Sequence, residues 1–263
     1  MIEIVAGAPL VIAANRDELY ARPTRSPEVL RATSSPTSGQ TSRIAGGLDV
    51  LSGGTWLAVR ADARFAAVTN QRALATPPLG LRSRGLAVLE LAAAPDPDAY
   101  VAALDPAAYA SMNLAWGDAT GVRIAYIRRE DRTVDVVSLP PGIHVLCNDR
   151  VDADGFPRGE RLAAAIERAV AVAPSWPAIA EPLSALLGDH TRVTLADTPP
   201  SHLPPELARE LTATCIHSDH YGTRSASIIA AAPGRVLSYR HTDGPPCTTH
   251  FVEQRHLLEG AAI

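Results

Sequence analysis

In the stretch Ala13-Ala14-Asn15-Arg16-Asp17-Glu18, four polar side chains directly follow an apolar run. Residues 8–14 (APLVIAA) have the composition of a buried strand. A strand that ends in Asn-Arg-Asp-Glu brings polar groups to the rim of a sheet, where α/β-type folds tend to place chemistry. The other interpretation is a polar turn with a surface ion pair, which contributes little free energy. This stretch alone leaves both interpretations open.

Composition narrows the classes of protein to which the chain can belong. All 24 basic residues are Arg, which excludes Schiff-base chemistry, a Lys general base and a P-loop lysine. The net charge of −4 does not favour a nucleic-acid or anionic-membrane partner. The three cysteines do not have the number or spacing of a disulfide framework, which favours a reducing compartment. No apolar run approaches the roughly 18 residues of a membrane span. We expect a soluble, cytoplasmic protein that binds a small molecule and no nucleic acid, with its oligomeric state open.

Polar clusters that contain Asn recur at the ends of expected strands. The strands over 64–69 and 144–147 end in residues 70–72 (NQR) and 148–150 (NDR), and a strand near 224–231 begins with residues 221–225 (YGTRS). An Asn amide can stabilise an oxyanion, an Arg can hold a carboxylate or lower a thiol pKa, and an Asp can orient an amine. Such a set suits acyl transfer around a nucleophile. Taken singly, each cluster is equally explained as a turn, because Asn and Asp favour turns.

The order of expected elements predicts the architecture. Residues 19–52 are rich in Pro, Ser, Thr and Gly and read as one long connection. Amphipathic spacing predicts helices over 83–94, 158–173 and 176–187, and a further helix that begins after the cap Asp96. Strands followed by a helical pair, and then the same order again, favour sheet packed on sheet with helices outside.

Seven short segments, spread over most of the chain, support a more specific interpretation: residues 10–23 (LVIAANRDELYARP), 53–59 (GGTWLAV), 65–70 (FAAVTN), 83–85 (SRG), 112–117 (MNLAWG), 146–148 (LCN) and 221–227 (YGTRSAS). In this order they resemble the NRDE family, whose eukaryotic members include the transport-and-Golgi-organisation protein 2. That family is similar to the N-terminal-nucleophile hydrolases of the choloylglycine hydrolase and penicillin acylase branch. The resemblance implies an α+β fold, an αββα sandwich of two antiparallel sheets between helical layers, formed by one domain over residues 1–263.

The resemblance also implies roles for individual residues. Arg16 and Asp17 would flank a nucleophile, Asn70 and Asn148 would line an oxyanion hole, and Arg224 would complete the polar cluster. Asp17 and Glu18 compete for the single acidic role. The candidate ligand-binding side chains are Asn15, Glu18, Trp56 and Tyr221, with packing in the core as the alternative for Trp56.

The first residues depart from the family pattern. Family members typically begin Met-Cys, and removal of Met exposes a Cys whose own amine serves as base. This chain begins Met1-Ile2-Glu3, so the polar cluster has no nucleophile as written. Our leading hypothesis is therefore a binder of a small hydrophobic ligand, with haem or an acyl or lipid species as candidates and with catalysis left open. The alternative is a linear-amide hydrolase whose Cys precedes this start, which the shortness of the strand-like residues 2–5 favours.

Two groups of Cys and His residues invite comparison with metal sites. Residues 215–220 (CIHSDH) form the first group, and His241, Cys247 and His250 form the second. Neither has the C-x2–4-C or H-x3–5-H spacing typical of zinc sites. On a strand, alternate side chains would also face opposite ways. We interpret both groups as polar loops and expect no metal site.

Overall fold

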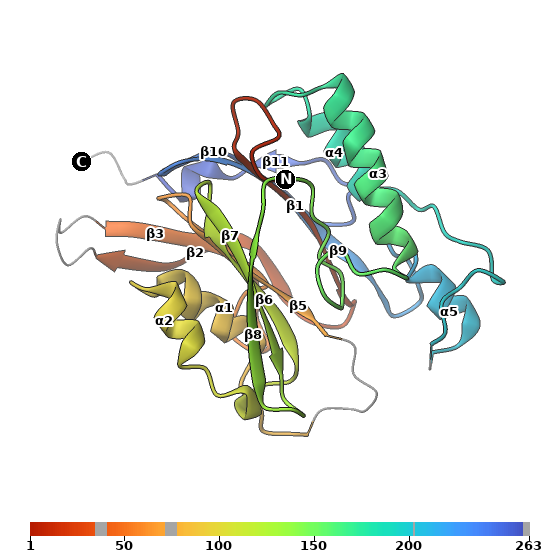
Figure 1. The fold of residues 1–263 in the computed structure, drawn as a ribbon, viewed down its shortest axis with the longest axis horizontal. Coiled ribbons are helices and arrows are strands. Elements are labelled where there is room, and N and C mark those ends of the chain that lie inside the picture. Colours follow the sequence, from red (N-terminus) through yellow and green to blue (C-terminus); the bar gives the residue numbers. More distant parts are fainter. Residues whose placement is uncertain (35–40, 72–77, 202, 260–263) are drawn as a thin grey trace.

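Two antiparallel sheets lie face to face in the computed structural model, which describes residues 1–34, 41–71, 78–201 and 203–259 (Figure 1). The smaller sheet has the order β1 (Leu10–Leu19), β9 (Tyr221–Ala232), β10 (Arg235–Thr242) and β11 (Val252–Glu253). The larger sheet follows chain order: β2 (Thr24–Ser34), β3 (Thr41–Asp49), β4 (Leu57–Arg60), β5 (Phe65–Asn70), β6 (Met112–Asp118), β7 (Gly121–Arg128) and β8 (Thr133–Leu139).

Helices cover the outer faces of both sheets. The helices α1 (Arg84–Ala93) and α2 (Pro97–Ala102) lie on the larger sheet, and α3 (Pro157–Val172) and α4 (Ala180–Leu187) lie on the smaller one (Figure 1). The short α5 (Pro205–Glu210) stands in the connection to β9, and single 3-10 turns span Pro106–Ala108 and Arg255–Leu257. This order of layers confirms the predicted αββα sandwich.

Three apolar cores hold the layers together. The middle core lies between the sheets. It contains Leu57 and Phe65 of the larger sheet and Ile229 and Tyr239 of the smaller sheet. A second core lies between α1 and the larger sheet, and a third between the smaller sheet and α3 and α4. Because strand side chains alternate between faces, each sheet contributes to the middle core and to one outer core.

The first strand runs further than its sequence predicts. We expected it to end at Ala14, but β1 continues to Leu19 and pairs with β9 along its whole length. The residues from Asn15 to Glu18 therefore belong to the sheet and not to a turn at its rim. Arg16 pairs with Ser225 and Asp17 with Thr223, so Arg224 is an extra residue of β9 and marks a β-bulge in that strand, which increases the local twist.

Two further expectations are wrong. The predicted long connection over 19–52 contains the strands β2 and β3, which pair as a hairpin at the end of the larger sheet. The predicted strand over 144–147 does not form. Side-chain bonds hold that segment instead: Val145 N–H donates to Asp152 Oδ1 at 2.7 Å, and Thr69 Oγ1 donates to the Cys147 carbonyl at 2.8 Å.

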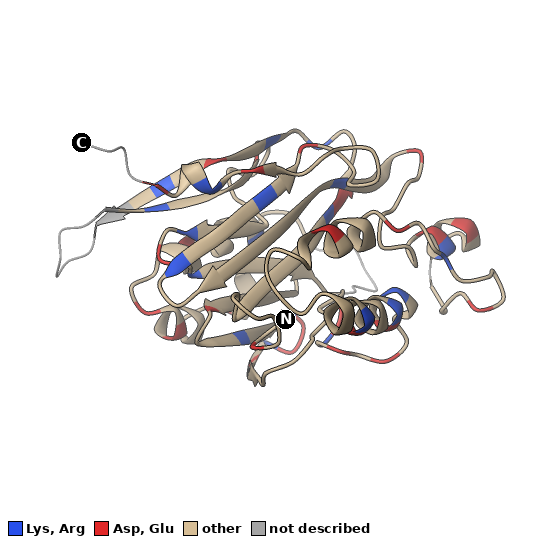
Figure 2. Ribbon diagram, turned by 90° about the horizontal axis from the view of Figure 1, so that it is seen from above, with Lys and Arg blue, Asp and Glu red and all other residues tan. Residues whose placement is uncertain are grey.

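Charged residues are distributed over the helices, strands and loops. Figure 2 shows the positions of acidic and basic residues interleaved along the ribbon of the described chain. Among the described residues, no helix is both long and apolar enough to cross a membrane.

Gly54 tests how closely the segment before β4 must approach α1. A Cβ at this position would lie 2.3 Å from the Gly85 carbonyl carbon and 2.5 Å from the Leu86 nitrogen. We expect Gly54→Ala to lower the free energy of unfolding by about 1–3 kcal/mol, the usual cost of overpacking. The control Gly121→Ala, whose Cβ would meet nothing within 4 Å, should change it by less than about 0.5 kcal/mol. Equal urea midpoints for the two variants would contradict the prediction.

Buried His241 gives the fold a pH dependence. Its Nδ1 lies 2.9 Å from Ser227 Oγ in the neighbouring strand, and burial lowers the pKa of His241 from 6.5 to about 4. Between those values the unfolded chain binds the proton and the folded chain does not. The free energy of unfolding should therefore fall by up to about 3 kcal/mol as the pH falls from 6.5 to 4. Urea unfolding of His241→Gln should show a shallower decline, whereas the exposed control His256→Gln should keep the parental slope.

Candidate functional site

A cleft of about 500 Å³ opens beside the polar stretch of β1. Residues of β1, the end of β5, the start of α1 and the segment 146–148 line it together. Sequence segments far apart in the chain thus meet at one place. The structure brings eight of the nine predicted site residues to this cleft: Asn15, Arg16, Asp17, Glu18, Trp56, Asn70, Asn148 and Tyr221.

Arg224, the ninth predicted residue, is not among the residues that line the cleft. Its Nη1 donates to the backbone carbonyls of Leu19, Tyr20 and Arg22 at 3.0, 2.8 and 3.1 Å. These bonds hold the chain that leaves β1. Arg224 therefore fixes the turn that follows the polar stretch.

Asp17 connects three elements through its two carboxylate oxygens. Oδ1 accepts a hydrogen bond from Thr223 Oγ1 of β9 at 2.7 Å, and Oδ2 lies 3.3 Å from Nη1 of Arg158 on α3. Nη2 of Arg158 donates in turn to Asn148 Oδ1 at 3.2 Å. Although burial acts against its charge, Asp17 and the Cys147 thiol raise the pKa of Arg158 above its ordinary value.

Sequence reasoning missed Arg158, which it placed only at the start of an expected helix. A signal was present. The N-terminal turn of a helix carries a partial positive charge and disfavours a cation, so an Arg at that position calls for a carboxylate partner. Asp17 is that partner.

The two Asn residues of the predicted oxyanion hole are joined directly. Asn148 Nδ2 donates to the Asn70 carbonyl at 2.8 Å, which ties the segment 146–148 to the end of β5. A side-chain amide carries two hydrogens, so Asn148 keeps one for a ligand. The Asn70 side chain itself is exposed at the cleft.

Arg16 is the least compensated charge in the cleft. Its side chain is only 7% exposed, its guanidinium carbon lies 4.3 Å from the centre of the Trp56 ring, and its Nη1 has no hydrogen-bond partner among the described residues. Burial lowers the pKa of Arg16 and likewise that of Arg84 at the start of α1. Neither guanidinium has a carboxylate within ion-pair distance in the described part of the chain.

The acidic side chains of the cleft are already paired. Glu18 Oε1 accepts the Leu19 N–H at 2.9 Å, and its Oε2 lies 3.6 Å from Arg22 Nε. Asp49 forms a closer pair with Arg22, at 2.5 Å. Together with the ion pair of Asp17, these contacts leave the unpaired charge of the cleft positive, which favours an anionic ligand.

Two further side chains add possible chemistry. Burial, followed by the nearby Asp17 charge, raises the pKa of Tyr221, so this phenol stays protonated and can donate a hydrogen bond. Cys147 is half-buried and lines the same cleft, whereas Cys215 and Cys247 lie outside it.

Comparisons with known proteins identify relatives of the chain and proteins that share its fold. The family model described as Transport and Golgi organisation 2 matches residues 4–239. A Homo sapiens protein, Transport and Golgi organization protein 2 homolog, is 29% identical over 237 residues, which cover 84% of this chain and 81% of that protein. Two variants of the conjugated bile acid hydrolase from Clostridium perfringens share the fold, with TM-scores of 0.52 and 0.53. They are 9% and 10% identical, and both comparisons cover 95% of this chain and 91% of theirs.

Proposed function

The chain belongs to the Transport and Golgi organisation 2 family, and from this membership and the cleft we propose that it binds a small amphipathic molecule through a carboxylate. The ligand candidates are an acyl or lipid species and haem. The observation that carries the proposal is the buried Arg16, whose Nη1 has no partner among the described residues. A carboxylate supplies the two acceptor oxygens that a planar guanidinium binds best.

The lining of the cleft suits a ligand with one charged end and an apolar body. Arg16 and Arg84 supply the unpaired positive charge, and Trp56 adds an aromatic face beside Arg16. Val68 and Leu146 also line the cleft. Apolar contact would contribute affinity, and the guanidinium pair would fix which end of the ligand enters.

Haem shares this chemistry, because its two propionates are carboxylates on an apolar body. No His lines the cleft in the described ranges, and the residue types that can ligate haem iron there are Cys147 and Tyr221. The raised pKa of Tyr221 disfavours a phenolate, so Cys147 is the residue that would hold the iron. Bound haem would supply redox chemistry at its iron.

Arg16→Gln tests the proposed carboxylate contact. Loss of a charged hydrogen bond worth about 1.5–3 kcal/mol should weaken binding about 10- to 100-fold. The probes are a fluorescent long-chain fatty acid and haemin, titrated separately by fluorescence and by absorbance. The control is Arg235→Gln, an exposed position on β10 away from the cleft. Unchanged affinity for both probes in Arg16→Gln would overturn the proposal, and binding of one probe alone would identify the class of ligand.

Amide hydrolysis is the second candidate, and the geometry of the first residues favours it. Met1 N donates to the Val11 carbonyl at 3.0 Å, and Val11 N–H donates to the Met1 carbonyl at 3.0 Å. Residues preceding Met1 would continue this antiparallel pairing along β1 toward Asp17. A cavity of about 190 Å³, lined by Met1, Asp17, Cys147 and Arg158 among others, lies along that path.

In this mechanism a Cys on the preceding residues would attack the amide carbonyl through its thiolate. Its own α-amine would take the thiol proton and pass it to the leaving amine. Water would then hydrolyse the thioester. Asp17 would hold the α-amine, and the free N–H of Asn148 would donate to the oxyanion.

Asn148→Ala tests the hydrolase candidate in protein from the native host whose first residue has been sequenced. If that residue is Cys, loss of one oxyanion donor should raise the activation free energy by about 2.7–4 kcal/mol and lower kcat about 100- to 1,000-fold. The control is Arg168→Ala, an exposed position on α3. A mature chain that starts at Met1, or an unchanged kcat in Asn148→Ala, would sink this candidate.

A further inference from the structure

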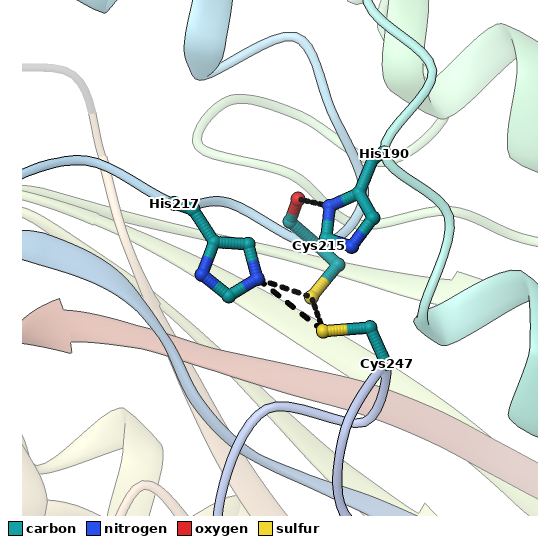
Figure 3. Close-up of side chains that lie close together, drawn as sticks. All are labelled: His190, Cys215, His217 and Cys247. Atoms are coloured by element: carbon teal, nitrogen blue, oxygen red, sulfur yellow. Dashed lines mark hydrogen bonds between the residues drawn. The ribbon is translucent and has the colours of Figure 1, made fainter.

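Three loops outside the cleft bring four metal-binding side chains together. His190 follows α4, Cys215 and His217 precede β9, and Cys247 follows β10 (Figure 3). One ligand atom from each residue lies within 4.8 Å of the other three. The sequence divided these residues between two groups and gave no reason to include His190. The close-up shows His217 and both sulfurs directed toward a common centre.

Three of the four residues in this Cys–His cluster have the spacing of the corners of a metal tetrahedron. The two sulfurs lie 3.7 Å apart, and His217 Nε2 lies 3.7 Å from Cys215 Sγ and 3.3 Å from Cys247 Sγ. In a regular zinc tetrahedron with Zn–S of 2.3 Å and Zn–N of 2.0–2.1 Å, the S–S and S–N edges are about 3.8 and about 3.6 Å. These three residues thus have the spacing required for one ion, and a ligand atom of His190 lies within 4.8 Å of theirs.

His190 has the orientation of a ligating imidazole. Its Nδ1 lies 3.0 Å from the carbonyl oxygen of Cys215, which can only accept, so Nδ1 carries the proton. The lone pair is then on Nε2. Zinc-binding histidines commonly donate their second ring N–H to a backbone carbonyl in this way, which fixes the tautomer and the ring.

We propose that His190, Cys215, His217 and Cys247 bind one Zn²⁺ ion in a tetrahedral Cys₂His₂ site. Four protein ligands leave no open position, so the site is structural. Tetrahedral coordination by two sulfurs and two nitrogens favours zinc among the common divalent ions. A Cys215–Cys247 disulfide is the competing state of the same sulfurs, but it requires them about 2.05 Å apart, and both thiols are free here.

The loops that carry the ligands also hold the polar stretch of β1. Asn15 Nδ2 donates to the carbonyls of Leu187 and Thr214, at 2.9 and 2.8 Å. Leu187 ends α4 just before the loop of His190, and Thr214 precedes Cys215 directly. Ile216 N–H, between two ligands, donates to Thr223 Oγ1 at 2.9 Å, and this hydroxyl donates to Asp17. The ion would therefore fix the loops that position Asn15 and Asp17.

Metal titration of the full chain without an affinity tag tests the proposal. Protein treated with a chelator and kept reduced is titrated with Co²⁺, followed by Zn²⁺. We expect one Co²⁺ per chain, with thiolate charge-transfer absorption and the visible bands of tetrahedral cobalt. Stoichiometric Zn²⁺ should remove both signals and raise the Tm. Absence of stoichiometric binding by the reduced, folded protein would overturn the proposal.

Variants at two of the three ligands that are not buried keep the test independent of folding. Cys247→Ser and His217→Ala should each weaken Zn²⁺ binding by more than about 100-fold. Mutation of a residue that only hydrogen-bonds to a metal ligand costs up to about 100-fold in affinity, and loss of a ligand itself should cost more. The controls are Cys147→Ser and His250→Ala, which remove the same side-chain types outside the cluster and should bind Zn²⁺ as the parent does. Parental affinity in both ligand variants would contradict the proposal. A Cys215–Cys247 disulfide that resists reduction would contradict it as well.

Discussion

Pairing of β1 with β9 along all of β1 is the interaction on which the cleft depends. It keeps the backbone from Asn15 to Glu18 inside a sheet, so its polar groups are satisfied while the side chains remain available. A slip of one residue would turn every side chain of β1 to the opposite face. The bulge at Arg224 of β9, opposite Arg16 and Asp17, adds twist at the point where the polar side chains meet the cleft. Register and bulge together determine which groups a ligand would meet.

The negative charges of the cleft are paired, but one of its buried positive charges is not. Asp17 and Glu18 each form an ion pair with an Arg. Such pairing is expected, because burying a carboxylate without a partner costs free energy. Arg16 does not have such a partner in the described ranges, although it is more buried than either. Its contact with Trp56 offsets only part of the cost of desolvation. Side chains that break the rules of packing in this way tend to mark functional sites.

Sequence predicted the layers and most of the cleft, because its signals there are local. Apolar periodicity identified α1 and α3, and polar clusters at the ends of strands identified the cleft residues. The hairpin of β2 and β3 escaped detection, because its Pro, Ser and Thr content resembles that of a loop. Arg158 and the Cys–His cluster escaped for another reason. Their partners are distant in the chain: Arg158 meets Asp17 across 141 residues, and Cys215 meets Cys247 across 32.

A helix holds the polar side chains of the cleft on one side, and loops hold them on the other. On one side, Arg158 stands on the regular helix α3, whose backbone bonds fix its place. On the other side, the bonds to Asn15 come from the last carbonyl of α4 and from the loop before β9. Loops lack the repeated hydrogen bonds of a helix and are the more mobile elements of most proteins. A closed four-ligand site that joins three loops would give this side the rigidity that α3 gives the other. The Cys–His cluster would then serve the cleft without touching a ligand in it.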